Sequence, residues 1–347
     1  MVLSKIKLNE MKNKKKLSKN DIKKYVKNSY NFQKINKIHS LTHNNINSTI
    51  YKISTPDDEY LLRFFTDGVG KFNSTPKKIE NICFIQNNCY NFGLNVQQPI
   101  FNKKGKFTDP SRNLFITKYY PGSIFSGTPK ELRSLSKNLA LLHKYLKKQK
   151  LQLKSQIDQP IRKILSLKEL NIMYDELSDN RTNKFENIFF NNFESIKILI
   201  KNHKKNSPKF NLKKTQKQLI HNDLHPHNVI FNQGNVLAFL DFNSMGNGYK
   251  IEDIAFASFR FSIHKNQNFR KMINKCKIFV NEYEKFNNIT QTEKKLYGYY
   301  IRNRLLRNLS YILRVKFFID KNFQWDVDLT KNLNYLKITS DFEYDEW

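Results

Sequence analysis

The sequence predicts an α+β fold with two lobes, a small mostly β N-terminal lobe and a larger mostly helical C-terminal lobe. At 347 residues the chain is longer than a typical single hydrophobic core, so two lobes are the expectation. Short runs of β-branched and aromatic residues dominate the first 120 residues, whereas leucines at helical spacing follow Pro121 and Gly122. A hydrophobic fraction of 39% is ample for a folded core.

The N-terminal part divides into a basic tail and a β-rich lobe. Residues 1–20 are predicted to be a disordered basic N-terminus and residues 21–120 to form the N-lobe. This lobe begins with a helix over 21–33 and contains a second helix over 76–91, which has apolar residues at helical spacing. The strands are predicted at Ile46–Ile53, Tyr60–Phe65, Gln97–Asn102 and Asn113–Tyr119, and the turn residues Pro56–Glu59 join the first two into a hairpin.

The C-terminal part, residues 121–347, is predicted to be mostly helical. Its first helix has one apolar face, formed by Leu132, Leu135, Leu139, Leu142 and Leu146. Residues 160–204 and 270–320 also have helical patterns, and a short β segment over 218–242 interrupts them. This part therefore forms a helical lobe around one β insertion.

Charge and cysteine content limit the classes of function. The formal net charge is +31, but lysine is scattered through every segment, and the one dense run, Lys12–Lys19, lies in the predicted tail. No basic motif interleaved with aromatic residues is present, so we expect no specific nucleic-acid partner. The chain has no apolar run near the ~20 residues of a membrane span and no apolar signal-peptide core. With only three cysteines, which form no framework, it is expected to be cytoplasmic.

The chemistry is concentrated in residues 219–242, predicted to form a catalytic hairpin. Strands Val229–Phe231 and Val236–Leu240 flank a turn, so the hairpin brings Asn228 and Asp241 together. Asp223 lies five residues before Asn228 on the same loop. Two oxygen ligands for Mg²⁺ with one free carboxylate beside them suit phosphoryl transfer, because that carboxylate can take the proton of an acceptor hydroxyl.

This stretch resembles the catalytic loop of kinase folds, in the pattern His221-x-Asp223-x-x-x-x-Asn228 followed by Asp241 and Phe242. More closely, it resembles the aminoglycoside phosphotransferase and choline kinase superfamily. The resemblance extends from about Ile46 to about Leu313 and is specific over residues 219–255. It implies a protein-kinase-like fold, ATP as co-substrate, Mg²⁺ on Asn228 and Asp241, and Asp223 as the catalytic base. The acceptor it implies is the hydroxyl of a small molecule.

Weaker matches in the N-lobe imply a nucleotide site. Asn47–Tyr51 resembles the hairpin that covers the phosphates, and Arg63 occupies the position of the lysine that holds them. Glu80 resembles the ion-pair partner of that lysine. Lys118 and Tyr119 resemble the hinge whose backbone contacts adenine.

Two further residues are expected to brace the catalytic loop. Asp253, in an Asp-Ile-Ala sequence, resembles the bracing aspartate of the family, and His221 is expected to hold the loop through hydrogen bonds. His143, by contrast, is interpreted as an ordinary histidine at a helix end.

Departures from the family pattern keep an alternative function open. Asn44 and Asn45 stand in the covering hairpin where glycine is usual, and Arg63 replaces a lysine. A catalytically inactive kinase fold that binds a nucleotide or another ligand is therefore the second hypothesis.

Two other classes are less well supported. A zinc site of His221, Asp223, His225 and His227 gives no reason for Asn228 or Asp241. A protein kinase is disfavoured because no Ala-Pro-Glu sequence follows Asp241. The acceptor stays open among amino alcohols, homoserine, sugars and aminoglycoside-like compounds. Acidic residues of the C-lobe, including Glu252, are expected to be solvated rather than to bind an amine.

Overall fold

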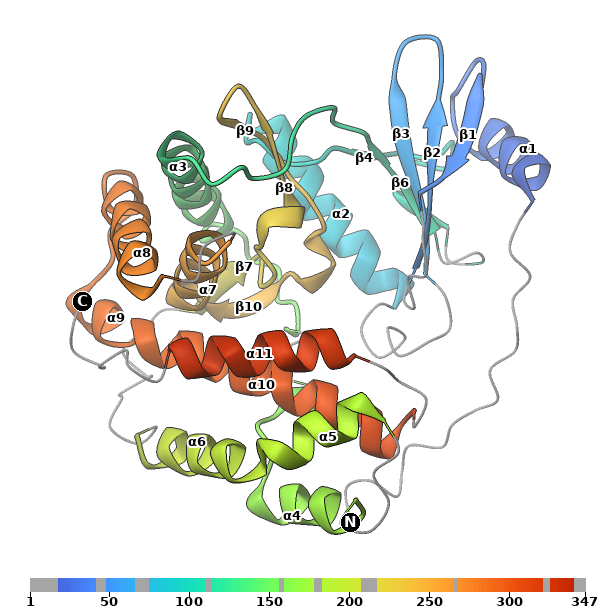
Figure 1. Cartoon of the computed structure of the whole chain (residues 1–347). Coiled ribbons are helices and arrows are strands. Elements are labelled where there is room, and N and C mark those ends of the chain that lie inside the picture. The colour runs from blue at the N-terminus through green and yellow to red at the C-terminus, as the bar shows by residue number, and fades with distance from the viewer. Residues whose placement is uncertain are drawn as a thin grey trace. The chain divides into compact units, whose positions relative to one another are not determined.

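The computed structural model describes residues 18–41, 48–65, 75–109, 111, 114–155, 159–177, 183–206, 217–264, 268–320 and 325–339. The chain divides into two compact units (Figure 1). The first comprises Met1–Ile124 and Val229–Asn243, and the second comprises Phe125–Asn228 and Ser244–Trp347. Residues 1–17 of the predicted tail, and Asn44 and Asn45, lie outside the described residues.

The first unit is built on an antiparallel sheet in the order β1-β2-β3-β6-β4, with β5 also paired to β6. Its strands are β1 (Lys37–Ser40), β2 (Ser48–Ser54), β3 (Glu59–Phe65), β4 (Pro99–Ile100), β5 (Thr108–Asp109) and β6 (Leu114–Lys118). The predicted hairpin is confirmed as β2–β3, where the amide N–H of Thr55 donates to the carbonyl of Asp58 across the turn. β1, which was not predicted, pairs with β2.

Two helices pack in this unit. α1 (Lys19–Ser29) begins two residues before the predicted helix, because Ser18 and Asp21 form a capping box. It ends at Ser29 rather than at residue 33, because Tyr30 adopts an extended conformation. α2 (Pro76–Asn91) confirms the predicted helix and begins at the cap residue Thr75. The core of the sheet holds Ile22, Val26 and Tyr30 of the α1 region with Ile53, Leu62 and Ile116 of the strands.

The β insertion is divided between the two units. β8 (Val229–Asn232) and β9 (Asn235–Phe239) form the predicted hairpin, and it belongs to the first unit. There the amide of Gln97 donates to the carbonyl of Phe239, and Ser123 exchanges backbone hydrogen bonds with Phe231. These backbone pairings explain why the hairpin, which the sequence groups with the C-terminal lobe, packs with the N-terminal residues. β7 (Lys217–Ile220) instead pairs with β10 (Gly246–Tyr249) in the second unit.

The second unit is mostly helical, as predicted. α3 (Pro129–Leu146) is capped by Thr128 and Glu131 and buries the five predicted leucines. The predicted helical stretches are each interrupted by caps and turns. The remaining helices are α4 (Leu167–Asp175), α5 (Lys184–Asn191), α6 (Phe193–Asn206), α7 (Lys250–Ser262), α8 (Phe269–Glu284), α9 (Gln291–Lys295), α10 (Tyr297–Phe318) and α11 (Asp326–Ile338). α10 packs against α6, α7 and α11, which explains why most of its residues are buried.

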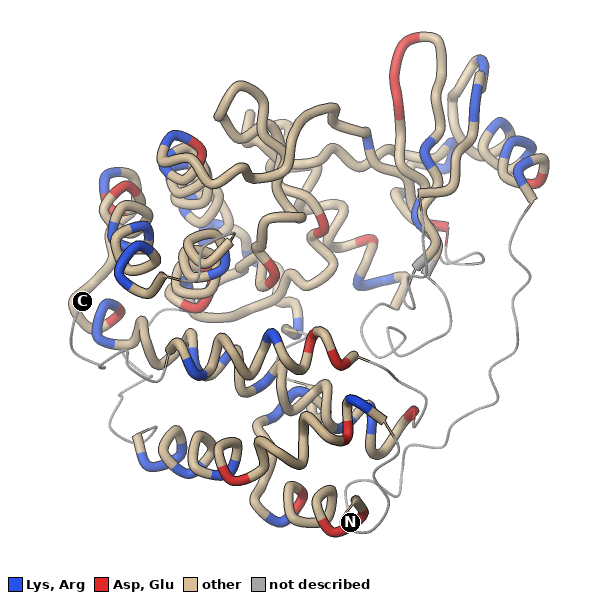
Figure 2. Tube along the Cα trace, viewed as in Figure 1, with Lys and Arg blue, Asp and Glu red and all other residues tan. Residues whose placement is uncertain are grey.

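Basic residues are spread over the helices of both units, interspersed with acidic residues (Figure 2). Among the helices that the structure describes, none combines the length and the apolar character that a membrane span requires.

Candidate active site

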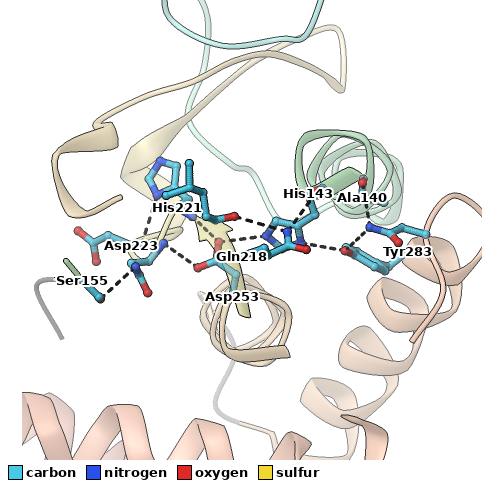
Figure 3. Close-up of polar contacts among 11 residues, drawn as sticks. Ala140, His143, Ser155, Gln218, His221, Asp223, Asp253 and Tyr283 are labelled. Atoms are coloured by element: carbon cyan, nitrogen blue, oxygen red, sulfur yellow. Dashed lines mark hydrogen bonds and ion pairs between the residues drawn. The ribbon is translucent and has the colours of Figure 1, made fainter. Parts of the chain in front are cut away.

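The loop that follows β7 carries Asp223 and is held by the carboxylate of Asp253 (Figure 3). Asp253 lies in the first turn of α7 and is 2% exposed. Its Oδ2 atom accepts from the amide of His221 and its Oδ1 atom from the amide of Asn222, both at 2.7 Å. These bonds stabilise the left-handed backbone of Asn222 (φ 68°), which few residues other than glycine adopt. The two predicted bracing residues, His221 and Asp253, are therefore in direct contact.

His143 of α3 holds the same carboxylate from the other side. Its Nε2 atom lies 3.2 Å from Oδ2 of Asp253, and its Nδ1 atom lies 2.8 Å from the hydroxyl of Tyr283. Because a carboxylate only accepts, Nε2 is the donor in the bond to Asp253. The helix-end interpretation placed His143 in the correct turn, but it missed a fully buried residue that orients Asp253.

Asp223 and Asn228, the predicted base and metal ligand, are brought together on this loop. The Nδ2 atom of Asn228 donates to the carbonyl of Asp223 at 2.8 Å, and the amide of Asp223 donates to Nδ1 of His221 at 3.3 Å. The Asp223 side chain is 36% exposed, and Asn228 is 8% exposed. The backbone of Asp223 is therefore fixed while its carboxylate faces solvent. Since Nδ2 of Asn228 is used, Oδ1 is the atom that can ligate a metal.

Asp241 lies at the end of the β8–β9 hairpin, in the first unit. Its Oδ1 atom lies 3.0 Å from Nη1 of Arg63 on β3 and accepts from Nδ2 of Asn243 at 2.7 Å. Its backbone is left-handed (φ 54°), a conformation that costs roughly 1–2 kcal/mol for such a residue. The fold thus joins two predicted site residues that are far apart in sequence, Arg63 and Asp241.

Glu80 does not pair with Arg63, contrary to the prediction. Its Oε1 atom accepts from the amide of Phe107, and its Oε2 atom accepts from the amide and the hydroxyl of Thr108 at 2.8 and 2.7 Å. The carboxylate therefore links α2 to β5, because consecutive backbone amides there offer it a bidentate partner. In the described part of the chain, the ion-pair partner of Arg63 is Asp241.

Lys118 and Tyr119 lie where β6 ends. The Nζ atom of Lys118 pairs with Asp58 at 2.8 Å, and this hydrogen bond raises the pKa of the lysine. The amide of Lys118 donates to the carbonyl of Gln98, and the amide of Tyr119 donates to that of Glu59. The predicted hinge therefore uses both backbone N–H groups within the protein, and the carbonyl of Lys118 accepts from Nε2 of Gln97 at 3.1 Å.

Residues 37–275, which include all the predicted site residues described above, match a family model described as the phosphotransferase enzyme family. This span covers more than half of the chain. The chain belongs to the phosphotransferase enzyme family. The search of curated proteins finds no match.

Solved structures show the fold of this phosphotransferase. The spectinomycin phosphotransferase APH(9)-Ia, solved with ADP and spectinomycin, has a TM-score of 0.71 at 15% identity, with 94% of this chain and 99% of that chain covered. The amicoumacin kinase hAmiN, solved with AMP-PNP, Ca²⁺ and its ligand, has a TM-score of 0.64 at 14% identity, with 95% and 96% covered. The choline kinase LicA from Streptococcus pneumoniae has a TM-score of 0.60 at 14% identity, with 93% and 99% covered. The predicted superfamily and fold class are confirmed.

The sequence did not identify Arg304 as a residue next to the predicted base. Its Nη2 atom, on α10, donates to the carbonyl of Asn222 at 2.6 Å and lies 3.5 Å from Oδ1 of Asp223. Burial lowers the pKa of Arg304 to about 10, which is still well above neutral pH, so this side chain is charged at neutral pH. An arginine inside an amphipathic helix carries no motif, and only the packing of α10 reveals its position.

Within the described ranges, no group of three or more His, Cys, Asp and Glu side chains is placed to hold a metal ion. Mg²⁺ does not require such a group, since it binds one or two protein oxygens together with substrate phosphates and water. The carboxylate of Asp241 and the amide oxygen of Asn228 are hard oxygen donors and fit this cation.

Proposed function

We propose that this phosphotransferase transfers the γ-phosphate of ATP to a hydroxyl group of a small molecule, with Mg²⁺ as cofactor. The observation that carries the proposal is the Asp223 loop. Its backbone is fixed by Asp253 and Asn228, while the carboxylate of Asp223 stays exposed. A carboxylate held in this way can meet an acceptor hydroxyl without reorganising the loop.

Asp223 acts in this proposal as the general base. It accepts the proton of the acceptor hydroxyl as that oxygen forms a bond to the γ-phosphorus. The bond between the γ-phosphorus and the bridging oxygen breaks, and ADP leaves with its electron pair. The acceptor is an amino alcohol, homoserine, a sugar or an aminoglycoside-like compound.

Asn228 and Asp241 are proposed to hold Mg²⁺, and Arg63 to bind the phosphates. Mg²⁺ supplies positive charge that neutralises the charge developing on the transferred group. Arg63 already lies against the Asp241 carboxylate, so its guanidinium is kept at the proposed metal ligand. The nucleotide complexes of the spectinomycin phosphotransferase and of the amicoumacin kinase support ATP and a divalent ion. Glu80, Lys118 and Tyr119 are proposed to support the structure around the nucleotide site, without a contact of their own to the phosphates.

The protein is proposed to work in the cytoplasm. Cys83, Cys89 and Cys276 are buried free thiols, which fit a reducing compartment.

The alternative is an inactive module, favoured by the arginine at position 63. In this alternative, the guanidinium of Arg63 stays paired with the carboxylate of Asp241, and Mg²⁺ cannot bind to that carboxylate. Binding of Mg-ATP and turnover therefore need separate measurements.

The test combines a thermal shift with an acceptor screen on the full chain. We expect Mg-ATP to raise the melting temperature, because it binds only the folded state. We also expect ADP to form at a rate that depends on one class of hydroxyl compound. A shift without acceptor-dependent ADP would favour the inactive module, and the absence of both would contradict the proposal.

A further inference from the structure

A pocket in the second unit adjoins the proposed catalytic loop. Its lining includes Asn222 of that loop, Glu252 and Asp253 of α7, and Arg304 and Arg307 of α10. Arg304 lies 3.5 Å from Oδ1 of Asp223, and Asn222 directly precedes Asp223 in the chain, so the lining shares residues with the surroundings of the proposed base.

The two acidic residues of the lining are not equivalent. Asp253 already accepts from two backbone amides and from His143, so its oxygens are engaged in holding the loop. Burial by itself raises the pKa of Asp253, but the hydrogen bond and charge of His143 outweigh it and lower the pKa. Glu252 also lies in the lining, and its charge acts on Arg304.

Arg304 has a hydrogen-bonding group without a partner. Its Nη2 atom donates to the carbonyl of Asn222, whereas its Nε atom is buried and has no acceptor among the described residues. Asn222 has the complementary feature, a buried Oδ1 atom that no donor reaches in the described part of the chain. Buried polar groups in folded proteins are nearly always hydrogen-bonded, so both atoms require an explanation.

Arg307 adds a second guanidinium to the same pocket. It lies three residues after Arg304, which places both side chains on one face of α10. Its Nε atom donates to the carbonyl of Arg162 at 3.2 Å, and this bond orients the planar group. Guanidinium groups bind carboxylates and phosphates through paired hydrogen bonds, which makes two of them in one pocket a site for such an anion.

We infer that this pocket binds a negatively charged substituent of the acceptor, a carboxylate or a phosphate held by Arg304 and Arg307. The inference rests on the proposed function, because it names the class of molecule whose hydroxyl meets Asp223. The substrate is then a small hydroxylated acid, which narrows the acceptors of the proposed function to those that carry a negatively charged substituent.

The experiment measures equilibrium binding of small alcohols to the full chain by calorimetry, without nucleotide. The probes are γ-hydroxybutyrate, glycerol phosphate, propanolamine and butanediol, which present a carboxylate, a phosphate, an ammonium group and no charge. We expect at least one anionic probe to bind at least about tenfold more tightly than propanolamine and butanediol. The anionic probe with the higher affinity indicates whether the substrate carries a carboxylate or a phosphate.

Variants assign the binding to the pocket. Arg307→Gln should weaken binding of the anionic probe by about tenfold or more. Arg307→Lys should weaken it less, because lysine keeps the positive charge but replaces the planar guanidinium by a point charge. Arg133→Gln is the matched control, since Arg133 is 53% exposed and pairs with Glu282 outside the pocket. Melting temperatures of all variants verify folding, and the lysine variant carries the test if the glutamine variant does not fold.

Three results would overturn the inference: no binding of either anion, equal or tighter binding of propanolamine, or equal affinities for Arg307→Gln and Arg133→Gln. A thermal shift with Mg-ATP on the same samples reports separately on the proposed function. Anion binding without that shift would sink the phosphotransfer proposal and leave the anion site standing.

Discussion

Asp253 is a buried carboxylate of the second unit, and both of its oxygen atoms accept hydrogen bonds. Its partners are the amides of His221 and Asn222 and the ring of His143. These partners lower its pKa against the opposing effect of burial. A group whose pKa is lower in the folded state contributes stability above its unfolded pKa of about 4, and this contribution is lost as the pH falls through the folded pKa.

Replacing Asp253 by Asn is therefore expected to lower the free energy of unfolding by about 2–4 kcal/mol at pH 7. The amide keeps one oxygen but turns an NH₂ group toward a backbone N–H that needs an acceptor. Urea unfolding measures the loss. The difference from wild type should begin to shrink below about pH 4, where the unfolded-state carboxylate is protonated, and should vanish as the pH falls through the lower pKa of the folded state. Asp57→Asn, the same change in an exposed turn, should alter stability by less than about 0.5 kcal/mol. Equal stabilities of the two variants would contradict the bracing role.

Asp241 is expected to be essential for metal-dependent nucleotide binding. Asp241→Ala removes the proposed carboxylate ligand, so Mg²⁺ should no longer increase the thermal shift produced by ATP. Asn243→Ala, which removes only a side chain that donates to Asp241, should keep the magnesium effect. An unchanged dependence on Mg²⁺ in Asp241→Ala would rule out metal ligation at this position.

The site residues that could be predicted from the sequence are those that follow one another at fixed spacing. Asp223, Asn228 and Asp241 follow a local pattern, and Asp253 follows in a recognisable signature. Arg304, His143 and the true partners of Glu80 come from residues far away in sequence, on helices and short strands without a motif. Only the packing of the folded chain brings them to the loop.

Among the elements, the β8–β9 hairpin depends on a close approach of two backbones. Ser123 exchanges backbone hydrogen bonds with Phe231, and the preceding Gly122 lies against this strand. A Cβ atom at position 122 would lie 2.5 Å from the carbonyl oxygen of Phe231 and 2.6 Å from a methyl group of Ile230. Only glycine therefore fits at this position without a shift of the hairpin.

Gly122→Ala is predicted to destabilise the protein by about 1–3 kcal/mol, because the backbones must separate and their bridge is strained. Chemical denaturation gives this value, and hydrogen exchange of the Phe231 amide should become faster. Ser123→Ala, which keeps the backbone bridge, is the control and should cost little. If the alanine at 122 is as stable as the control, the close approach does not exist in solution.

The accuracy of element prediction followed the strength of the local pattern. α2, α3 and the two hairpins have clear periodicity and turn residues, and they were predicted. β1 and β5 span four and two residues and carry too little pattern to be found, whereas β4 was predicted but is shorter than the expected Gln97–Asn102. The breaks within 160–204 were readable in part, because Ser166 with Glu169 forms a capping box that starts α4.

At the scale of the whole molecule, the formal net charge is +31, and in the described part of the chain the basic residues occur on many elements rather than in one run. Lysine and arginine are distributed over the helices of both units with acidic residues between them (Figure 2). A dispersed charge binds polyanions without sequence preference and is screened by salt.

We therefore predict that the protein is retained on DNA or RNA columns no more strongly than an unrelated protein of similar net charge. Retention of both should fall steeply with salt concentration, because it reflects counterion release alone. Elution of each protein over a salt gradient measures this. Selective retention on one nucleic-acid sequence at physiological salt would show a specific interface that the dispersed charge does not predict.

The order of the two units along the chain was predictable from composition, whereas the assignment of the hairpin was not. Its strands pair with residues near 96 and 123, more than a hundred positions away, and no local pattern encodes such a pairing. The family relationship, by contrast, was visible in residues 219–255, because the chemistry of the loop constrains residue types at fixed spacing.

The most direct test compares turnover of wild type and Asp223→Ala with the best acceptor from the hydroxyl screen. The account predicts a loss of about a hundredfold to ten-thousandfold in kcat, with the thermal shift by Mg-ATP retained and with Asp57→Ala as an unaffected control. Turnover of Asp223→Ala close to that of wild type, on a folded variant, would contradict the assignment of Asp223 as the base.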